Sequence, residues 1–457
     1  MSNQPSAKNI TLVLFHNDLR VTDNATLAKA ANLSSNGQLL LVYAPSLADT
    51  LNKKVSRQAY YYDTIGGARK LFLSESLVAL DASLMQLGNR LLYLQNNLAA
   101  ADTLTQLSEL ICQQHVTDIC VSQTADYDQN QVCKHLQAQN PQVRWHVQTT
   151  ATLFDTLPLD ELPKSFTAFR KKIESNYDLL QATEDIMICS TPESLPPMPE
   201  TLQNSSEYFF AASTLAEPVF AESSFNELPQ QLSDFKGGET NGLKHLESYF
   251  DSDAPSTYKT TRNALDDWTH STKFSAWLAN GSLSVNMVLN RLRRYERDII
   301  ANDSTYWIWF ELLWREYFYW YAIAHQQKLF WFKGIALHSP STQFNQKRLA
   351  QWKNGTTQYP IVNACMNQLK STGYMSNRGR QLVASCFIHE LGLDWRYGAT
   401  YFEQHLIDYD VASNWGNWQY LAGVGADPRG CRQFNLNKQT QQYDPNGEFI
   451  RKWQGEV

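Results

Sequence analysis

Residues 10–15 read ITLVLF, a short apolar run rich in β-branched side chains that predicts a buried β-strand. Four similar runs follow at intervals filled by longer stretches with helical periodicity: LLLVYA (39–44), RLLYL (90–94), DICVS (118–122) and VRWHV (143–147). Alternating strands and helices are typical of a parallel, doubly wound sheet. The sequence therefore predicts an α/β domain over residues 7–150. No Gly-x-Gly-x-x-Gly follows the first run, so a Rossmann dinucleotide site is not indicated, although any ligand would favour the carboxyl ends of the strands.

The segment after the predicted sheet differs in composition. Residues 173–235 contain eleven Asp or Glu residues, six prolines and no Lys or Arg, which is typical of a connector over a protein surface. From residue 237 the periodicity is helical to the end. We therefore predict an N-terminal α/β parallel-sheet domain, a long linker at 151–236 and a C-terminal all-α domain at 237–457.

Composition narrows the classes of protein. The chain has 457 residues, 43% of them apolar and 18% charged, which indicates a globular protein with more than one core. Its net charge of −6 comes from the linker, because 24 basic residues face 20 acidic ones from Lys236 onward, a net charge of +4. A local nucleic-acid patch is compatible with that balance, but a wholly basic domain is not.

The chain also carries no signal for export, membrane insertion or metal binding. No apolar run reaches the roughly 18 residues of a membrane span, and no basic-then-apolar leader opens the chain. Seven cysteines without a C-x-x-C motif suit a reducing compartment and argue against disulfides and zinc. We expect a soluble cytoplasmic protein without a metal site.

The helical half concentrates unusual combinations of side chains. Twelve of the thirteen tryptophans follow residue 236. In DYDVASNWGNWQYLAGVGADPR (408–429), helical spacing places Asp410, Asn414 and Trp418 on one face, where a core helix would carry Leu or Ala. In YWIWFELLWREYF, Trp314 and Arg315 follow Glu311 by three and four residues, so a helix would place all three side chains on one face. A surface Glu/Arg pair is the alternative interpretation there.

Two further stretches could hold polar groups of a ligand. In GYMSNRGRQ (373–381), Asn377 and Arg380 share a helical face while Arg378 points elsewhere, and two solvated arginines are the alternative. In HSTKFSAWLANG (270–281), hydroxyl residues precede an apolar helix. Free N–H groups and hydroxyls there could hold a phosphate, whereas plain helix capping is the commoner use of such residues.

Together these stretches resemble the DNA photolyases and cryptochromes. The matching motifs occur in the family's order: FHNDLRVTDNATL (15–27), YKTTRN (258–263), STKFSAWL (271–278), FELLWREYF (310–318), MSNRGRQ (375–381), GLDWRYG (392–398) and DYDVASNWGNWQY (408–420). The forms STYW (304–307), MSNRGRQ and AGVGADPR (422–429) resemble the cryptochrome DASH branch. The resemblance implies an N-terminal antenna domain and a C-terminal helical domain that binds FAD in a U shape.

The resemblance implies a set of FAD-binding residues. They are Tyr258, Ser271, Thr272, Lys273, Phe274, Ser275, Glu311, Arg315, Asn377, Arg380, Asp408, Asp410 and Asn414. Arg380 and Asp408 are implied to form an ion pair beside the isoalloxazine, and Asn377 is implied to face flavin N5. A neutral amide there can hydrogen-bond the ring without adding negative charge. Animal cryptochromes carry Cys and plant cryptochromes Asp at this position, so Asn favours repair.

Substrate contacts are implied in the same way. Glu311 resembles the acid that hydrogen-bonds a flipped pyrimidine dimer, and Trp314 resembles an aromatic wall of that pocket, so both join Asn377 as catalytic candidates.

Arg262 and Arg378 resemble contacts to DNA phosphates. Gln381 and Tyr420 stand where double-strand photolyases carry Met and Trp. A more polar pocket offers less stacking to offset flipping from a duplex, which predicts a preference for single strands.

Electron transfer and light harvesting give further candidates. Trp418 and Trp395 match the first two members of the family's photoreduction chain, while the third has no clear counterpart, and Trp331 or a tyrosine could replace it. In TADYDQN (124–130), Asp126 could contact an antenna 5,10-methenyltetrahydrofolate, although an exposed loop acid is the alternative.

The sequence therefore predicts a monomeric, light-driven lyase that repairs cyclobutane pyrimidine dimers in single-stranded DNA by electron transfer from reduced FAD. A blue-light sensor that binds nucleic acid or a partner without repair is the main alternative. A nucleotide-binding α/β enzyme without light chemistry would leave the clustered tryptophans unexplained.

Overall fold

A computed structural model describes residues 9–45, 65–94, 103–176, 186–203, 209, 234–426 and 432–455. Five parallel strands form one sheet in the order β3-β2-β1-β4-β5. Their bounds are β1 (Ile10–Phe15), β2 (Gln38–Tyr43), β3 (Leu91–Tyr93), β4 (Asp118–Ser122) and β5 (Arg144–Gln148). The predicted parallel α/β sheet is thereby confirmed, with each apolar run supplying one strand.

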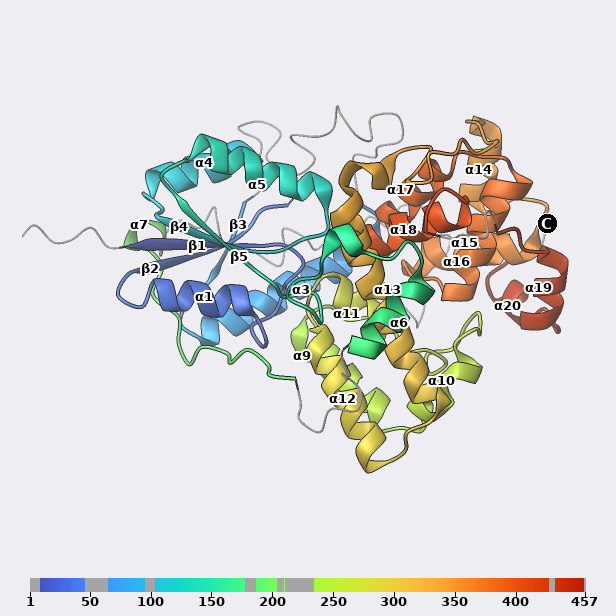
Figure 1. Ribbon diagram of the computed structural model, residues 1–457, viewed down its shortest axis with the longest axis horizontal. Coiled ribbons are helices and arrows are strands. Elements are labelled where there is room, and N and C mark those ends of the chain that lie inside the picture. The colour runs from blue at the N-terminus through green and yellow to red at the C-terminus, as the bar shows by residue number, and fades with distance from the viewer. Residues whose placement is uncertain are drawn as a thin grey trace, which may run out of the picture.

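Helices cover both faces of the sheet. They are α1 (Ala25–Leu33), α3 (Gly67–Gln86), α4 (Thr103–Gln113) and α5 (Tyr127–Gln139). Successive side chains of a strand point to opposite faces, so Leu12 and Leu14 pack with α4 and α5, while Val13 and Phe15 pack with α1 and α3. Figure 1 shows the resulting three layers at one end of the molecule.

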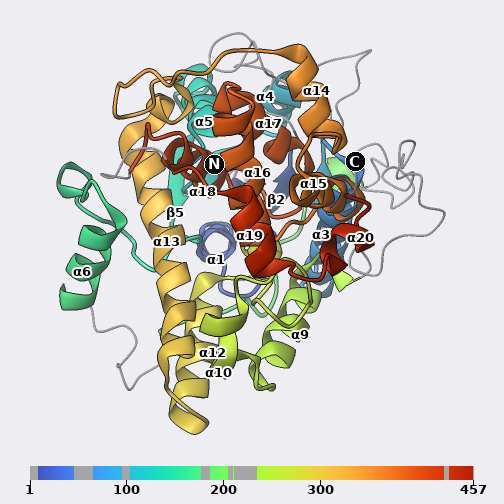
Figure 2. The ribbon, with the colours of Figure 1, turned by 90° about the vertical axis from the view of Figure 1, so that its right-hand side faces the viewer.

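The C-terminal region is helical, as predicted. Its elements are α9 (Glu239–Phe250), α10 (Ala254–Thr261), α11 (Ser275–Ala279), α12 (Val285–Asp298), α13 (Asp303–His325), η4 (Gln326–Phe330), α14 (Gln346–Asn354), α15 (Pro360–Thr372), α16 (Asn377–Ser385), η5 (Cys386–Glu390), α17 (Trp395–His405), α18 (Val411–Leu421), α19 (Leu436–Tyr443) and α20 (Glu448–Lys452). The long helix α13 begins at a capping box formed by Asn302 and Thr305. Figure 2 shows α13 running past α10 and α12, which both pack against it.

Much of the predicted linker lies outside the described residues. Its described parts include η1 (Leu159–Glu161), α6 (Phe166–Asn176) and α7 (Glu200–Gln203). The boundaries at residues 150 and 236 stay predictions, and the end of the AGVGADPR motif also falls outside the described residues. Within the described part of the chain, no helix is both long and apolar enough to cross a membrane.

A buried polar joint connects the sheet domain to the helices. The Arg20 guanidinium, with 1% of the residue exposed, donates to four backbone carbonyls, including that of Gly281 at 2.8 Å. The Asp23 carboxylate accepts from Ser284 Oγ at 2.5 Å. The Glu239 carboxylate accepts from the backbone N–H groups of residues 21 and 22. The motif at 15–27 therefore connects the two domains. We call Arg20, Asp23, Glu239 and their hydrogen-bond partners the domain joint.

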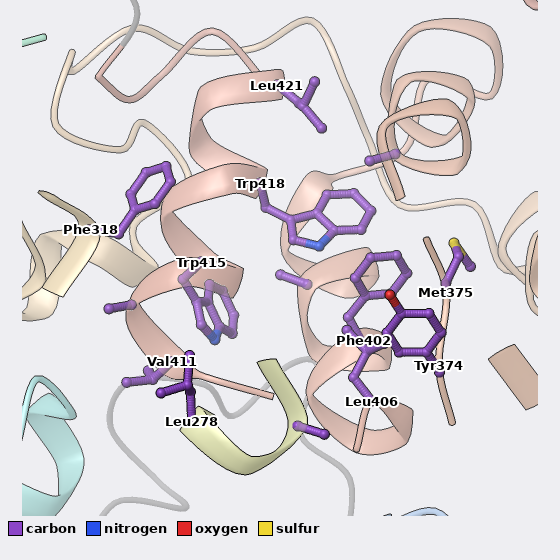
Figure 3. Close-up of a cluster of buried hydrophobic side chains, with 14 of the residues drawn as sticks. Leu278, Phe318, Tyr374, Met375, Phe402, Leu406, Val411, Trp415, Trp418 and Leu421 are labelled. Atoms are coloured by element: carbon purple, nitrogen blue, oxygen red, sulfur yellow. The ribbon is translucent and has the colours of Figure 1, made fainter. Parts of the chain in front are cut away.

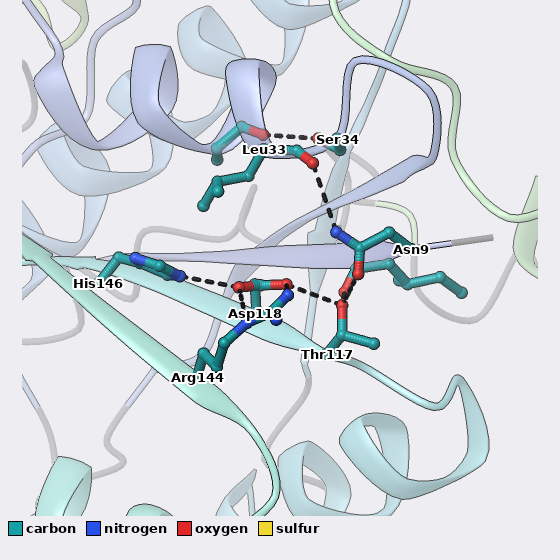
Figure 4. Close-up of polar contacts among 9 residues, drawn as sticks. Asn9, Leu33, Ser34, Thr117, Asp118, Arg144 and His146 are labelled. Carbon is teal, nitrogen blue, oxygen red and sulfur yellow. Dashed lines mark hydrogen bonds and ion pairs between the residues drawn. The ribbon is translucent and has the colours of Figure 1, made fainter. Parts of the chain in front are cut away.

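A second polar network fixes the outer strand at the amino ends of β4 and β5. The buried Asp118 carboxylate accepts from the Arg144 guanidinium at 2.7 and 2.8 Å and pairs with His146 at 2.8 Å (Figure 4). Burial raises the pKa of Asp118, but these hydrogen bonds outweigh it and hold the pKa well below its usual range. The network ties β5 to β4 at the end of the sheet opposite to the carboxyl ends where ligands bind.

Candidate functional site

Helices α10, α13, α16 and α18 position most of the predicted site residues. Helix α16 begins at Asn377 because Ser376 caps it, accepting from the Gly379 N–H at 3.1 Å. Helix α18 begins after Asp410, whose carboxylate caps it by accepting from the Ser413 N–H at 2.7 Å. Asp410 thus precedes the helix that the sequence placed it in, although Asn414 and Trp418 follow at the predicted spacing.

The predicted ion pair between Arg380 and Asp408 is present. Arg380 Nη2 lies 2.9 and 2.7 Å from the two Asp408 oxygens, and Arg380 Nε donates to the Met375 carbonyl at 2.8 Å. The Asp408 side chain is 2% exposed and that of Arg380 is 26% exposed. A carboxylate this deeply buried needs such a partner. The pair ties helix α16 to the segment that precedes α18.

Lys273 is a buried cation bonded only to neutral oxygens. Its ammonium donates to Ser271 Oγ at 2.7 Å and to the Asp267 carbonyl at 2.9 Å, while 7% of the residue is exposed. In the described part of the chain, no carboxylate forms an ion pair with it. The Asp267 carboxylate lies near enough for Lys273 to help lower its pKa, but the two form no direct ion pair. A buried ammonium without a direct ion-pair partner fits a phosphate of a bound dinucleotide.

The neighbouring residues contribute unequally to this cluster. Helix α11 has Phe274 at its N-cap position and no side-chain cap hydrogen bond, so the alternative that hydroxyl residues cap it is wrong. Phe274 is buried against Tyr249 and Phe250, which leaves its backbone as the part available to a ligand. The Thr272 carbonyl accepts from His245, and Ser275 is exposed at the start of α11.

Glu311 pairs with Arg262. Arg262 Nη2 lies 2.5 Å from Glu311 Oε1, and the two side chains are 17% and 31% exposed. Burial raises the pKa of Glu311, and Arg262 opposes that rise. Burial also raises the pKa of Tyr258, with a further contribution from Glu311. A carboxylate that is surrounded by protein and still partly accessible can receive a ligand hydrogen bond.

Arg315 does not pair with Glu311, so the alternative of a surface Glu/Arg pair is wrong. Its guanidinium donates to the Ala151 carbonyl at 2.5 Å and to the Leu278 carbonyl at 3.4 Å. The next residue, Glu316, is fully buried and accepts from the Leu153 N–H at 2.7 Å. Both side chains hold the segment that follows β5, a role that helical spacing gave no sign of.

The predicted aromatic wall is built from distant segments. The Trp314 ring lies 3.8 Å from that of Phe166, stacked at 11°, and 6.1 Å from that of Tyr420, edge-on at 79°. The Arg432 guanidinium lies 4.7 Å over the Tyr420 ring. Sequence reasoning missed Phe166, which lies in the predicted linker. One face of Trp314 is therefore covered, and its orientation is fixed.

The predicted phosphate contact Arg378 has neutral partners. It donates to Asn263 at 3.0 Å and to Gln439 at 3.3 Å, and it lies 4.7 Å over the Tyr443 ring. Asn377 is exposed at the start of α16, and Gln381 is half-buried one turn later. Burial lowers the pKa of Arg378, whose guanidinium lies where three separate segments meet.

Trp418 and Trp395 are buried around α17. Trp418 is 2% exposed, and its ring centroid lies 5.2 Å from that of Phe402 (Figure 3). The ring centroid of Trp352 lies 6.3 Å from it. Its indole packs against Gly398, one turn along the helix from Trp395, whose ring lies 5.7 Å from that of Trp415. Nothing in the sequence indicated that Trp352 and Trp415 lie beside Trp418 and Trp395, because their spacing is that of ordinary core residues.

Trp331 is next in sequence to a residue that contacts this group. Trp395 Nε1 donates to the carbonyl of Phe332 at 3.1 Å, and the adjacent Trp331 is 42% exposed. The position suits an outer station, although the predicted role itself stays a prediction.

Asp126 caps helix α5. Its carboxylate accepts from the backbone N–H groups of Asp128 at 2.9 Å and Gln129 at 3.3 Å. A plain loop acid is therefore a poor description of it. Contact with an antenna stays a prediction.

Comparisons with known proteins agree with this arrangement. Residues 11–192 match the family model described as DNA photolyase, and residues 307–457 match that described as FAD binding domain of DNA photolyase. The chain is similar to a cryptochrome DASH of Vibrio parahaemolyticus, with 49% identity over 98% of this chain and 94% of the relative. It is also similar to a cryptochrome DASH of Idiomarina loihiensis, with 47% identity over 98% and 93%. A solved Synechocystis cryptochrome covers 98% of this chain and 89% of its own, with 35% identity and a TM-score of 0.83.

Proposed function

The chain belongs to the DNA photolyase and cryptochrome family, in its cryptochrome DASH branch, and from this we propose that it repairs cyclobutane pyrimidine dimers in single-stranded DNA under blue light. The observation that carries the proposal is Glu311, a partly accessible carboxylate that extends from α13 one turn before Trp314. A sensor without repair chemistry has no need for such an acid.

The residues around Lys273 and Arg380 would hold FAD. Lys273 and Ser271 would bind its phosphates, while the Arg380 and Asp408 pair would lie beside its ring system with Asn377, Asp410 and Asn414. Bound FAD supplies the light-excited electron for dimer cleavage. The protein contributes position, a neutral amide at Asn377 and exclusion of bulk water by the buried aromatic residues.

Binding of a dimer would exchange the partners of Glu311 and Arg262. In the structure these two side chains bond to each other at 2.5 Å. Glu311 would turn to hydrogen-bond the flipped dimer, and Arg262 would turn to a flanking phosphate. The ion pair keeps both charges compensated until the substrate supplies replacement partners, which favours exchange over simple addition.

Trp418 would be the nearest electron donor when FAD is reduced by light, with Trp395 next. Trp418→Phe should fold and bind FAD but lose most of its blue-light reduction, measured as bleaching of the flavin absorbance, because Phe is much harder to oxidise. Trp331→Phe tests the outer station. A Trp418→Phe protein that bleaches at the parent rate would contradict the assignment.

The remaining assignments complete the proposal. An antenna 5,10-methenyltetrahydrofolate would bind near Asp126 and appear as a near-ultraviolet absorbance in the purified protein. We place the protein in the cytoplasm as a monomer, in keeping with seven cysteines that form no C-x-x-C motif.

The direct test is repair by the FAD-loaded protein. Dimer-containing single strands, bubbles and fully paired duplexes should be illuminated with blue light and the restored thymines counted. We expect efficient repair of single strands, intermediate repair of bubbles and poor repair of duplexes. Flavin photoreduction without repair of any substrate would favour the sensor alternative.

A further inference from the structure

A recess of about 490 Å³ lies at the N-terminal end of α19, outside the proposed FAD and dimer site. Its walls carry two aromatic rings, three amides and one carboxylate, from Tyr359, Phe434, Gln433, Asn435, Asn437 and Glu390. The volume is within the range of about 300–1,000 Å³ that is typical of small-ligand sites. Aromatic faces combined with amide groups are the chemistry that binds nucleobases.

The walls of the recess are held in place by hydrogen bonds. Glu390 accepts from Gln433 Nε2 at 3.0 Å and from the Tyr359 hydroxyl at 3.1 Å. The Phe434 N–H donates to Ser385 Oγ at 2.9 Å. Glu390 is the last residue of the π-helix η5, and such helices are frequent at functional sites. Three separate segments therefore present a preformed surface.

The recess adjoins residues of the proposed substrate site. The Phe434 ring that lines it lies 5.8 Å from the guanidinium of Arg378, the proposed phosphate contact. Two residues earlier, Arg432 lies 4.7 Å over the ring of Tyr420, which borders the proposed dimer pocket. A strand that places a dimer beside Tyr420 and a phosphate on Arg378 would bring a flanking nucleotide to Phe434.

We propose that this recess binds an unpaired nucleobase that flanks the dimer in a single strand, an inference that rests on the proposed function. The carboxylate of Glu390 disfavours a phosphate there, so the base and not the backbone enters. Gln433 already donates to Glu390, and Asn435 already accepts from the Lys438 N–H as the cap of α19. The remaining amide groups still include donors and acceptors, which permits hydrogen bonding to the edge of a base. A paired base has its edge occupied by its complement, so the recess adds to the preference for single strands.

The test uses the FAD-loaded protein and three variants with matched roles. Phe434→Leu keeps apolar bulk under Arg378 but removes the stacking face, and Asn437→Ala removes an exposed amide of the recess. Gln442→Ala is the control, since Gln442 is also exposed on α19 but does not line the recess. Affinity should be measured for three ligands: a dimer-containing single strand of about 12 nucleotides, the same strand without a dimer, and the isolated dimer dinucleotide.

We expect Phe434→Leu to weaken binding of both strands about tenfold and Asn437→Ala to weaken it severalfold, because stacking supplies most of the affinity. The isolated dimer should bind the parent and all variants equally. A fluorescent base analogue, moved along the strand, should be quenched at one position in the parent and not in Phe434→Leu.

Equal affinity of the parent and both recess variants for the long strands would overturn the inference, as would an equal effect of Gln442→Ala. If the undamaged strand still shows the variant effect while no dimer is repaired, the recess is supported and the proposed function fails. Preferential binding of an unrelated peptide to the recess would also overturn it. The two failures are therefore distinguishable.

Discussion

The domain joint and the proposed substrate site are both rich in buried charge, but they differ in how that charge is satisfied. At the joint, Arg20 places its donors on four backbone carbonyls and Glu239 takes two backbone N–H groups. On the ligand side, Lys273 of the proposed FAD cluster donates to neutral oxygens, and Glu311 of the proposed substrate site stays 31% exposed beside Arg262. Spare hydrogen-bonding capacity, rather than charge itself, distinguishes the part of the molecule that we propose receives ligands.

The largest effect is expected at the joint. Arg20→Met keeps the length of the side chain but leaves the carbonyls of Gly281, Thr150 and two other residues without their donor. Unfolding free energy, measured in urea, should fall by about 3–5 kcal/mol, while FAD affinity per folded molecule stays unchanged. Arg451→Met, at an exposed arginine of α20, is the control. If Arg20→Met lowers the unfolding free energy by less than about 1 kcal/mol, the domain joint contributes no more to stability than exposed surface residues do.

A pH-dependent effect is expected from Glu316, which binds the chain segment between the domains. Burial raises the pKa of Glu316 from 4.5 to about 7. The raised pKa means that the folded state favours the protonated carboxyl. Its contribution to stability is therefore complete below pH 4.5, declines as pH rises to 7 and is absent above that.

Glu316→Gln should remove this pH dependence, because the amide keeps an acceptor for the Leu153 N–H without titrating. The difference in unfolding free energy between parent and variant should change by up to about 3 kcal/mol between pH 4.5 and 7.5, on the order of 1.36 kcal/mol per pKa unit. Glu448→Gln, on the exposed surface of α20, should leave the slope unchanged. Parallel pH profiles for parent and Glu316→Gln would contradict the assignment.

Local sequence pattern predicted the sheet well. Each of the five runs became a strand. Strands β1, β2 and β4 are largely buried and therefore almost continuously apolar, whereas the edge strand β5 is more exposed and carries Arg144 and His146. The ion pair of Arg380 and Asp408 was also predicted, through the family resemblance. A capping role for Asp126 could have been recognised from an acidic residue placed just before a helix.

Contacts between distant segments were beyond sequence reasoning. Phe166 stacks on Trp314 from a segment whose composition indicated only a connector. Arg20 reaches Gly281, 261 positions along the chain, from a motif that served only as a family marker. The pairing of Glu311 with Arg262 was missed for the same reason, since each residue resembled a contact to a different part of the substrate. Such pairings depend on how the domains pack.

In contrast to changes at the domain joint, Glu311→Gln should lower dimer repair and leave the unfolding free energy unchanged. The amide keeps the shape of the side chain but loses the charge-assisted hydrogen bond, which is worth roughly 1.5–3 kcal/mol. Dimer repair should therefore fall by about ten- to a hundredfold, measured as restored thymines per absorbed photon, while flavin photoreduction survives. Glu247→Gln is the matched control, because Glu247 also pairs with an arginine, Arg291, but on α9. Equal repair by Glu311→Gln would make Glu311 a structural acid like those of the joint.

The smallest effect is expected for the residues that we propose set the preference for single-stranded over duplex DNA. Tyr420 and Gln381 are both half-buried, so Tyr420→Trp combined with Gln381→Met should change unfolding free energy by less than about 0.5 kcal/mol. Flipping a dimer from a duplex costs a few kcal/mol, whereas a single strand avoids most of that cost. A larger aromatic face opposite Trp314 adds stacking worth about 1 kcal/mol, which corresponds to about a fivefold gain in the ratio of duplex to single-strand repair. Tyr397→Trp, at a half-buried tyrosine outside the site, should leave that ratio unchanged. A parent that repairs both substrates equally would contradict this account of the pocket, and a stability change in the double variant would place Tyr420 with the joint instead.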